Sequence, residues 1–341
     1  MPASRCDSPA PDRQSDSATV TWRNVVIGMA VYNSATEALL LQAAADTWLR
    51  MARGVDLVLM TDSDDPRDAA SIAPTIPGSI ARVHVYRCAD CRSEKCESGG
   101  GGECAGVREG WLARRKVLHL FVAMARRFSG DATKSYFLKV DPDTVPLPHN
   151  LLRLLIELRT SLGAEQPYYF GMAACRVTSF PLCHASGGAG YGLSRAAVHA
   201  LQKYLETAYP AFLGRVDKFT YGGEDVAVAF ALKKQCGASV INTGCLYQHS
   251  PLKYAKLHAK GEEWVQWPLS TTPASFHKFK DASEMRTFFS CALYDARGKP
   301  RPAPRSLFVN LSVANCDDAW SSPSLADGER GVVADGGTIQ I

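Results

Sequence analysis

Residues 136–144 read Tyr-Phe-Leu-Lys-Val-Asp-Pro-Asp-Thr, and this stretch decides the expected fold. Its first half belongs to a short apolar run, residues 135–140, which indicates a buried β-strand. The run ends in two carboxylates, Asp141 and Asp143, and Pro148 begins the helix expected next. The stretch therefore predicts a strand that delivers acidic side chains to one edge of a sheet.

The chain before this stretch alternates between strand and helix patterns. Strands are expected at residues 25–32, 55–60 and 82–86, and helices at residues 34–50 and 109–128. Ser34 with Glu37 three residues later forms a capping box, which places the start of the first helix. Such alternation predicts an α/β fold, with a mostly parallel sheet and helices on both faces. Ligands bind such sheets at the carboxyl ends of strands, and two acidic turns, at Asp62 and Asp141, follow strand ends.

The second half of the chain mixes shorter elements. Strands are expected at residues 168–174 and 239–242, and helices at residues 194–204 and 224–234. We expect one domain at residues 23–298, with a Cys/Gly-rich loop at 88–107 where consecutive glycines exclude regular structure. Residues 1–22 are expected to form a disordered lead, and residues 299–341 a loose tail.

Composition narrows the classes of protein. The 341 residues are 46% hydrophobic, which is enough for a full core without staples. The 38 basic and 34 acidic residues give a net charge of +4, which excludes a strongly basic polyanion binder and a highly charged disordered chain. No apolar run reaches the ~18 residues that a membrane helix needs. The polar start of the chain shows no signal peptide.

The 11 cysteines point either to disulfides, and so to an oxidising compartment, or to a metal site. Four of them share one short stretch: Cys88, Cys91, Cys96 and Cys104. The close pair at its start allows a zinc site with the other two, but the second tight pair of a usual zinc motif is missing. Cys175 with Cys183, and Cys236 with Cys245, have spacings that a hairpin could close.

Three stretches could carry chemistry. Asp141 and Asp143 offer the oxygen ligands that hard divalent cations prefer, although an acidic turn before a helix is the simpler interpretation of the pair alone. The glycine-rich run at 186–191 would let the backbone approach a ligand closely, or would only form a tight turn. Asp225, at the start of an expected helix, is either a helix cap or a general base.

Five short strings, in this order, resemble glycosyltransferase family 31, in particular its core 1 β1,3-galactosyltransferases and its Fringe-like β1,3-N-acetylglucosaminyltransferases. They are Ala-Asp-Thr-Trp at 45–48 followed by the strand that ends at Asp62, Tyr-Phe-Leu-Lys-Val-Asp-Pro-Asp-Thr at 136–144, Ser-Gly-Gly-Ala-Gly-Tyr-Gly-Leu-Ser-Arg at 186–195, Gly-Glu-Asp-Val at 223–226 and Ala-Ser-Phe-His at 274–277. The likeness covers about residues 24–290.

The resemblance implies a GT-A fold, a UDP-sugar donor, a Mn²⁺ ion and inversion at the anomeric carbon. By position, Asp141 and Asp143 match the family's metal- and donor-binding D-x-D motif, and Asp225 matches its catalytic base. His249 lies near the family's metal-binding histidine, but the local match needs a shift of one residue. His277 is therefore the alternative ligand.

The resemblance also implies partners and further contacts. Asp62 and Lys116 fall on positions that contact the nucleotide, and we expect the turn with Gly187 and Gly188 to lie against the donor. The donor sugar is expected to be galactose, or N-acetylglucosamine, and the acceptor a glycan or glycoprotein in the Golgi lumen or secretory pathway. No nucleic-acid partner is expected, and a homodimer stays open. Pro142 stands where the family has an acidic residue, and the family's amino-terminal anchor is not visible in this sequence.

Two other interpretations stay open. The pattern at 140–144 also fits the haloacid-dehalogenase-like phosphatases, in which the first aspartate, here Asp141, is a nucleophile. That family begins with this motif, whereas here it lies deep in the chain. The second interpretation is a catalytically inactive sugar-nucleotide-binding or chaperone-like homologue. Retention of both aspartates of the D-x-D motif argues against it.

Overall fold

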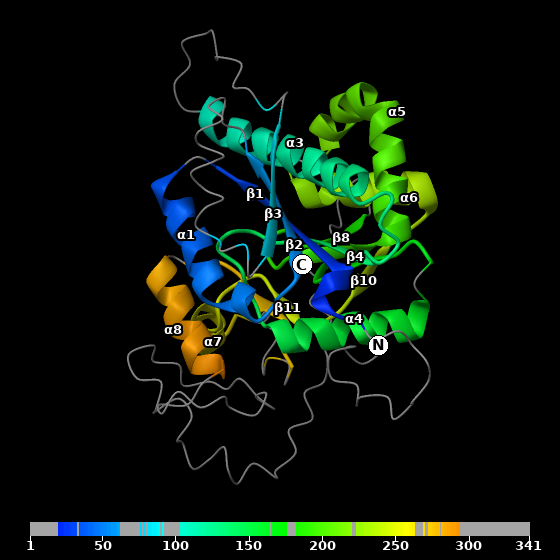
Figure 1. The fold of residues 1–341 in the computed structure, drawn as a ribbon. Helices are drawn as coiled ribbons and strands as arrows, with labels where there is room; N and C mark the ends of the chain where they lie inside the picture. The colour runs from blue at the N-terminus through cyan, green and yellow to red at the C-terminus, as the bar shows by residue number, and fades with distance from the viewer. Residues whose placement is uncertain are drawn as a thin grey trace.

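The computed structural model describes residues 20–32, 34–61, 76, 78, 81–88, 91, 103–163, 165–175, 182–219, 223–262, 269, 272–279 and 281–293, apart from the side chains of 103–113, 214–219 and 291–293. Within these residues, a seven-stranded sheet lies between two layers of helices (Figure 1). The strand order is β10-β6-β9-β4-β1-β2-β3. This arrangement confirms the expected α/β fold.

The central sheet is mostly parallel. Its strands are β1 (Val25–Val31), β2 (Val55–Thr61), β3 (Ala81–Arg87), β4 (Tyr136–Lys139), β6 (Tyr169–Gly171), β9 (Tyr191–Ser194) and β10 (Val240–Asn242). All pairs are parallel except those of β9, which runs antiparallel to both β4 and β6. Every residue of β1 and β2 is buried, because helices cover both faces of the sheet.

Two hydrophobic clusters fill the space on either side of the sheet. Successive residues of a strand point to opposite faces, so Ile27 and Met29 of β1 enter one cluster while Val26 enters the other. The first face is covered by α1 (Ala35–Asp46), α4 (Pro148–Leu162), α7 (Pro251–Ala259) and α8 (Ala282–Leu293). The second is covered by α3 (Glu103–Arg127), α5 (Arg195–Phe219) and α6 (Glu224–Cys236), as Figure 1 shows. None of the helices in the described part of the chain has the length and apolarity that a membrane span requires.

Two small sheets flank the central one. The first joins β11 (Leu246–Tyr247), β12 (Ser275–Phe276) and β5 (Val145–Pro146). Because β12 runs antiparallel to β5, the residue after Phe276 lies beside the residues before Val145. The second is a hairpin of β7 (Ala173–Cys175) and β8 (Cys183–Ala185). Both sheets are shorter than a periodicity argument can detect, and the sequence did not predict them.

Several element ends differ from expectation. The helix expected at 34–50 stops at Asp46 and continues as a 3₁₀ turn, η2 (Trp48–Arg50). α3 begins at Glu103, inside the expected 88–107 loop. The described residues begin with Val20, which is buried, and the 3₁₀ turn η1 (Trp22–Asn24) follows, so the last residues of the expected lead belong to the fold. The expected tail at 299–341 lies outside the described residues.

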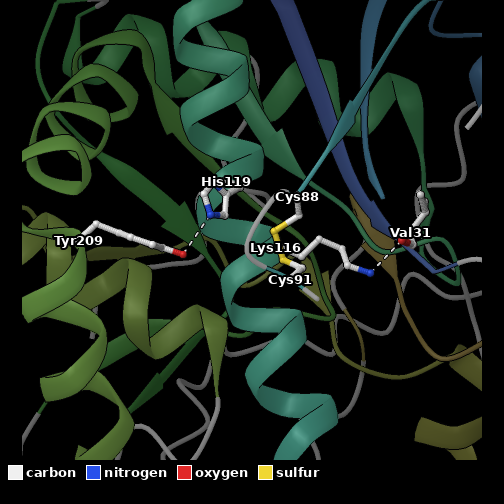
Figure 2. The surroundings of a disulfide bond; sticks show 6 residues. All are labelled: Val31, Cys88, Cys91, Lys116, His119 and Tyr209. Atoms are coloured by element: carbon white, nitrogen blue, oxygen red, sulfur yellow. Dashed lines mark hydrogen bonds between the residues drawn. A yellow bond between two sulfur atoms is a disulfide. The ribbon is translucent and has the colours of Figure 1, made fainter. Parts of the chain in front are cut away.

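Several of the described cysteines form disulfides. Cys88 bonds to Cys91 next to α3 (Figure 2), which contradicts a zinc site built on these two sulfurs. Cys175 bonds to Cys183 and closes the β7–β8 hairpin, as its spacing allows. The pairing of the other two is wrong: Cys245 is disulfide-bonded, whereas Cys236 is a free thiol that donates to a carbonyl of its own helix.

Candidate active site

A cavity of about 720 Å³ opens at the carboxyl ends of β1 and β4. This is the edge of a parallel sheet where ligands are expected to bind. It is lined by the end of β1 with the start of α1, the end of β4 with the turn after it, the glycine turn before β9, the start of α6 and the residues after β12, together with Val117 of α3 and Gln248 after β11. The side chains that carry its charge are Glu37, Lys139, Asp141, Asp143, Glu224, Asp225, His277 and Lys278.

Asp141, Asp143 and His277 form a group that could hold a metal ion, with one ligand atom of each lying within 4.8 Å of the others. The Nε2 atom of His277 is 2.9 Å from Oδ1 of Asp143 and 3.7 Å from Oδ2 of Asp141. The β5–β12 pairing explains this approach, and the amide of Phe279 also donates to the carbonyl of Asp143. Two carboxylates and an imidazole suit Mn²⁺ and similar cations.

The glycine turn packs directly against this group. A Cβ atom on Gly188 would lie 2.1 Å from Cε1 and Nδ1 of His277, so only glycine leaves room for the imidazole. The hydroxyl of Thr144 donates to the carbonyl of Gly188 at 2.9 Å, and that of Ser275 donates to the carbonyl of Ala189 at 2.5 Å. These bonds tie the turn to the residues on either side of the metal-binding group. The close approach of His277 explains why glycine is needed in the string at 186–191.

Lys139 lies at the centre of the cavity wall. It is buried, and its Nζ atom is 2.6 Å from Oδ1 of Asp141, 3.1 Å from Oε1 of Glu224 and 3.2 Å from the carbonyl of Gly187. Burial alone would lower the pKa of Lys139, but the two carboxylates outweigh burial and hold that pKa above its ordinary value. The ammonium of Lys139 binds Oδ1 of Asp141, and Oδ2 of Asp141 faces His277.

The two carboxylates at the start of α6 have different surroundings. Burial would raise the pKa of Glu224, but the ammonium of Lys139 outweighs it and lowers that pKa. The pKa of Asp225 is raised, by burial first and by the neighbouring charge of Glu224 second. Its Oδ2 accepts from the amide of Gly187 at 3.0 Å, and its Oδ1 accepts from the amide of Val226 at 2.8 Å. Of the two, Asp225 is therefore the better proton acceptor near neutral pH.

Glu37 is a third carboxylate of the cavity, next to the end of β1. Burial is the main cause that raises its pKa to about 7, and the charges of Asp141 and Asp143 add to it. Its amide donates to the hydroxyl of Ser34 at 3.2 Å, as the expected capping box requires. Its carboxylate instead accepts from the amide of Tyr32, two residues before the cap. The capping pattern thus found the residue but not its place in the cavity wall.

The remaining predicted residues lie elsewhere. Lys116 is fully buried on α3 and does not line the cavity. Its Nζ atom donates to the carbonyl of Val31 at 2.9 Å (Figure 2) and lies 3.4 Å from the centroid of the Tyr32 ring. Lys116 therefore binds the end of β1 from α3 and lies outside the cavity. Asp62 lies outside the described residues.

The geometry distinguishes His249 from His277, between which the sequence could not choose a metal ligand. His277 belongs to the group that could hold a metal ion, and His249 does not. The ring of His249 packs edge-on against Tyr254, with centroids 5.6 Å apart. Burial and the charge of Lys278 lower its pKa to about 4. The assignment of a metal ligand thus stays a prediction, and the contacts favour His277 for it.

Sequence reasoning missed four charged side chains of the wall, those of Glu37, Lys139, Glu224 and Lys278. Lys139 and Glu224 both stand inside the strings that were quoted, next to the residues that were chosen. A lysine in the last position of a buried strand was the available signal, because such a charge needs a partner. The identity of that partner depends on how β4 and α6 meet, which no local pattern shows.

Comparisons with known proteins complete the description. No protein-family model and no curated protein matches the chain. Similar solved structures include two of the glycosyltransferase GlyE of Streptococcus pneumoniae TIGR4, with TM-scores of 0.39 and, for the apo form, 0.38, at 10% and 12% identity. Each covers 75% of this chain, which spans only 55% of the GlyE chain. A glycosyltransferase involved in the glycosylation of the major capsid of PBCV-1 has a TM-score of 0.35 and 13% identity, and the match covers 78% of this chain and 98% of that one. These similar structures are thus all glycosyltransferases, at low identity.

Proposed function

We propose that the protein is a metal-dependent, inverting glycosyltransferase that uses a UDP-sugar and forms β1,3 linkages, as its resemblance to glycosyltransferase family 31 implies. One observation carries most of the support. A single cavity holds both the group of Asp141, Asp143 and His277 and the carboxylate of Asp225. Its volume of about 720 Å³ lies within the usual range of ligand pockets.

Each of the charged cavity residues has its own role in the proposed reaction. The acceptor oxygen forms a bond to the anomeric carbon, the bond from that carbon to the diphosphate oxygen breaks, and Asp225 takes the acceptor's proton. The raised pKa of Asp225 suits that role. A divalent cation held by Asp141, Asp143 and His277 would neutralise the charge that develops on the leaving diphosphate. Lys139 fixes Asp141, which leaves its second oxygen for the cation.

The donor sugar, the acceptor and the cellular compartment are more specific proposals. Galactose is the proposed donor sugar and N-acetylglucosamine the second choice, because the strings at 186–191 and 275–277 look most like those of the galactosyltransferases. The acceptor is proposed to be a glycan or glycoprotein hydroxyl. The disulfides Cys88–Cys91 and Cys175–Cys183 support an oxidising compartment, which fits the Golgi lumen.

The role of Asp225 gives the test. We expect Asp225→Asn to lower UDP release from UDP-galactose or UDP-N-acetylglucosamine by about 10²-fold or more, because the proton acceptor is lost. The affinity for UDP with Mn²⁺ should change little, since Asp225 lies outside the group of Asp141, Asp143 and His277. Initial rates and calorimetry on the same preparations measure both. The matched control is Glu206→Gln on α5, a carboxylate that pairs with Arg126 at the surface, and it should leave both values unchanged.

Other results would select other functions. Full turnover by Asp225→Asn would contradict its assignment as the base. UDP binding by the unaltered protein without release from either donor would favour an inactive sugar-nucleotide-binding homologue. Release of phosphate from p-nitrophenyl phosphate, lost in Asp141→Asn, would instead favour a phosphatase with Asp141 as its nucleophile.

A further inference from the structure

Asp225 has a neighbour on the side away from the cavity. His184 of β8 is 5% exposed, and its Nε2 atom lies 3.7 Å from Oδ2 of Asp225. It does not line the cavity, so a substrate there would touch Asp225 and not His184. The imidazole can therefore act on the reaction only through that carboxylate.

One short segment brings both the imidazole of His184 and the amide of Gly187 to the same oxygen of Asp225. Residues 183–187 run from the disulfide to the glycine turn, and the amide of Gly187 donates to Oδ2 of Asp225, the oxygen that faces His184. The segment is held at its start by the Cys175–Cys183 bond and at its middle by the amide of Ala185, which donates to the hydroxyl of Tyr169. The backbone that carries His184 is thus held in place by a disulfide and a hydrogen bond.

The surroundings of the two ring nitrogens of His184 indicate which of them carries the proton. Nε2 faces a carboxylate, whereas Nδ1 of His184 is buried and has no hydrogen-bond partner among the described residues. A ring nitrogen that faces a carboxylate carries the proton, because that proton is the only favourable contact on that side. The tautomer of His184 that has its proton on Nε2 points an N–H group toward Asp225.

We propose that His184 is the positioning residue of Asp225, which fixes the orientation of that carboxylate and keeps it ionised over the working pH range. The inference rests on the proposed function, in which Asp225 is the base. An opposite or partial positive charge beside a buried carboxylate favours its ionised form, and burial opposes it. Without the imidazole, Asp225 would be protonated over more of the pH range and could not accept a proton there.

Of the other titratable groups near Asp225, Glu224 acts in the opposite sense, and two tyrosines stay uncharged. Glu224 precedes it on α6, and its charge raises the pKa of Asp225. The hydroxyls of Tyr169 on β6 and Tyr191 on β9 also feel the charge of Asp225, and both stay protonated, since their pKa values lie above the ordinary value. His184 is the group in this set that lowers the pKa of Asp225.

The first experiment is a pH profile of UDP release from UDP-galactose and UDP-N-acetylglucosamine with Mn²⁺. We expect His184→Ala to move the acid limb of kcat up by about one unit, which lowers the rate about tenfold on the acid side and less at high pH. The KM for the donor should stay within about twofold, because His184 touches no substrate. His184→Gln keeps an N–H donor and should recover part of the loss. The control is His84→Ala, which removes the histidine of another pair, His84 with Asp56 at 3.0 Å, outside the cavity.

The second experiment needs no activity. In a ¹H–¹⁵N spectrum of the full chain with labelled histidines, the Nε2 resonance of His184, one of eight histidines, is assigned by its loss in His184→Gln. We expect Asp225→Asn to shift that resonance and Glu206→Gln to leave it in place. An unshifted resonance would overturn the proposal whatever the enzyme does.

The combined outcomes separate the two proposals. A shifted resonance together with a moved acid limb supports the role of His184. A shifted resonance with an unmoved limb, in a protein that releases UDP, overturns that role. If the unaltered protein releases UDP from neither donor, the proposed function fails, and the role of His184 in it is overturned with it.

Discussion

At the scale of single residues, Lys139 and Gly188 shape neighbouring parts of the cavity wall. Lys139 holds Asp141 and Glu224 by ion pairs, so two acidic side chains from β4 and α6 can lie side by side in a buried wall. Without this cation the like charges would oppose each other. Gly188 leaves the space in which the imidazole of His277 approaches Asp143.

The close approach at Gly188 gives a prediction at this scale. In Gly188→Ala the new Cβ atom would overlap the ring of His277, so the imidazole must turn away from Asp143. We expect Mn²⁺-dependent UDP binding to weaken by about 10–100-fold, as for other changes that misplace a metal ligand. Calorimetric titration of UDP at fixed Mn²⁺ measures this.

The control for this variant is Gly130→Ala. A Cβ atom on Gly130 would meet nothing within 4 Å, so we expect UDP affinity to stay the same. Stability should stay within about 0.5 kcal/mol, as for most surface changes. Equal UDP affinities for Gly188→Ala and Gly130→Ala would show that His277 does not need the position seen here.

The residue types of the site could be predicted, but several partnerships could not. The D-x-D pair and Asp225 stand in local strings with a recognisable pattern, and the structure places all three side chains on one cavity. The position of His277 follows from the pairing of β12 with β5, between segments more than a hundred residues apart. A sequence pattern carries no information on that contact, so His249 and His277 could not be separated.

At the scale of elements, the sequence predicted every strand of the central sheet except β9, the short strands β6 and β10 included. β1 and β2 are buried on both faces, and their apolar runs show this directly. β9 (Tyr191–Ser194) lies inside the glycine-rich string, which was interpreted as a close approach to a ligand or a tight turn, and not as a strand. Gly192 interrupts its pattern because Phe170 and Leu138 occupy the space where a Cβ atom would lie. A close-packed strand thus had the sequence of a loop.

The β7–β8 hairpin gives a prediction at the scale of elements. The Cys175–Cys183 disulfide closes a loop with a sequence separation of 8. We expect replacement of both cysteines by serine to lower the free energy of unfolding by about 2–3 kcal/mol, because the unfolded chain regains the closure entropy of that loop. Denaturant unfolding of the purified chain measures the difference.

The matched control for the hairpin is Cys236→Ser. Cys236 is a free thiol on α6, so its replacement removes a cysteine without opening a disulfide. We expect a change below about 1 kcal/mol. If the double variant were as stable as this control, the disulfide would not hold the hairpin that carries His184 and leads to Gly187.

At the scale of the whole molecule, the residues of the candidate active site lie at one edge of the central sheet. β1 and β4 end at the cavity, and the glycine turn precedes β9, the antiparallel strand beside β4. Because β9 runs the other way, its first residue lies at the same edge as the last residue of β4. The reversed strand therefore places Gly187 beside the D-x-D turn, and Asp225 at the start of α6 accepts from the amide of Gly187, so that Asp225 and the metal-binding group share one cavity.

The proposed function requires that this cavity bind a nucleoside diphosphate through a divalent cation. The direct test is a calorimetric titration of UDP into the unaltered protein, with Mn²⁺ and without it, and into Asp143→Asn with Mn²⁺. We predict binding that requires Mn²⁺ and that weakens at least about tenfold in Asp143→Asn, since one carboxylate of the group is lost. Equal UDP affinity in all three titrations, or no binding in any of them, would contradict the account.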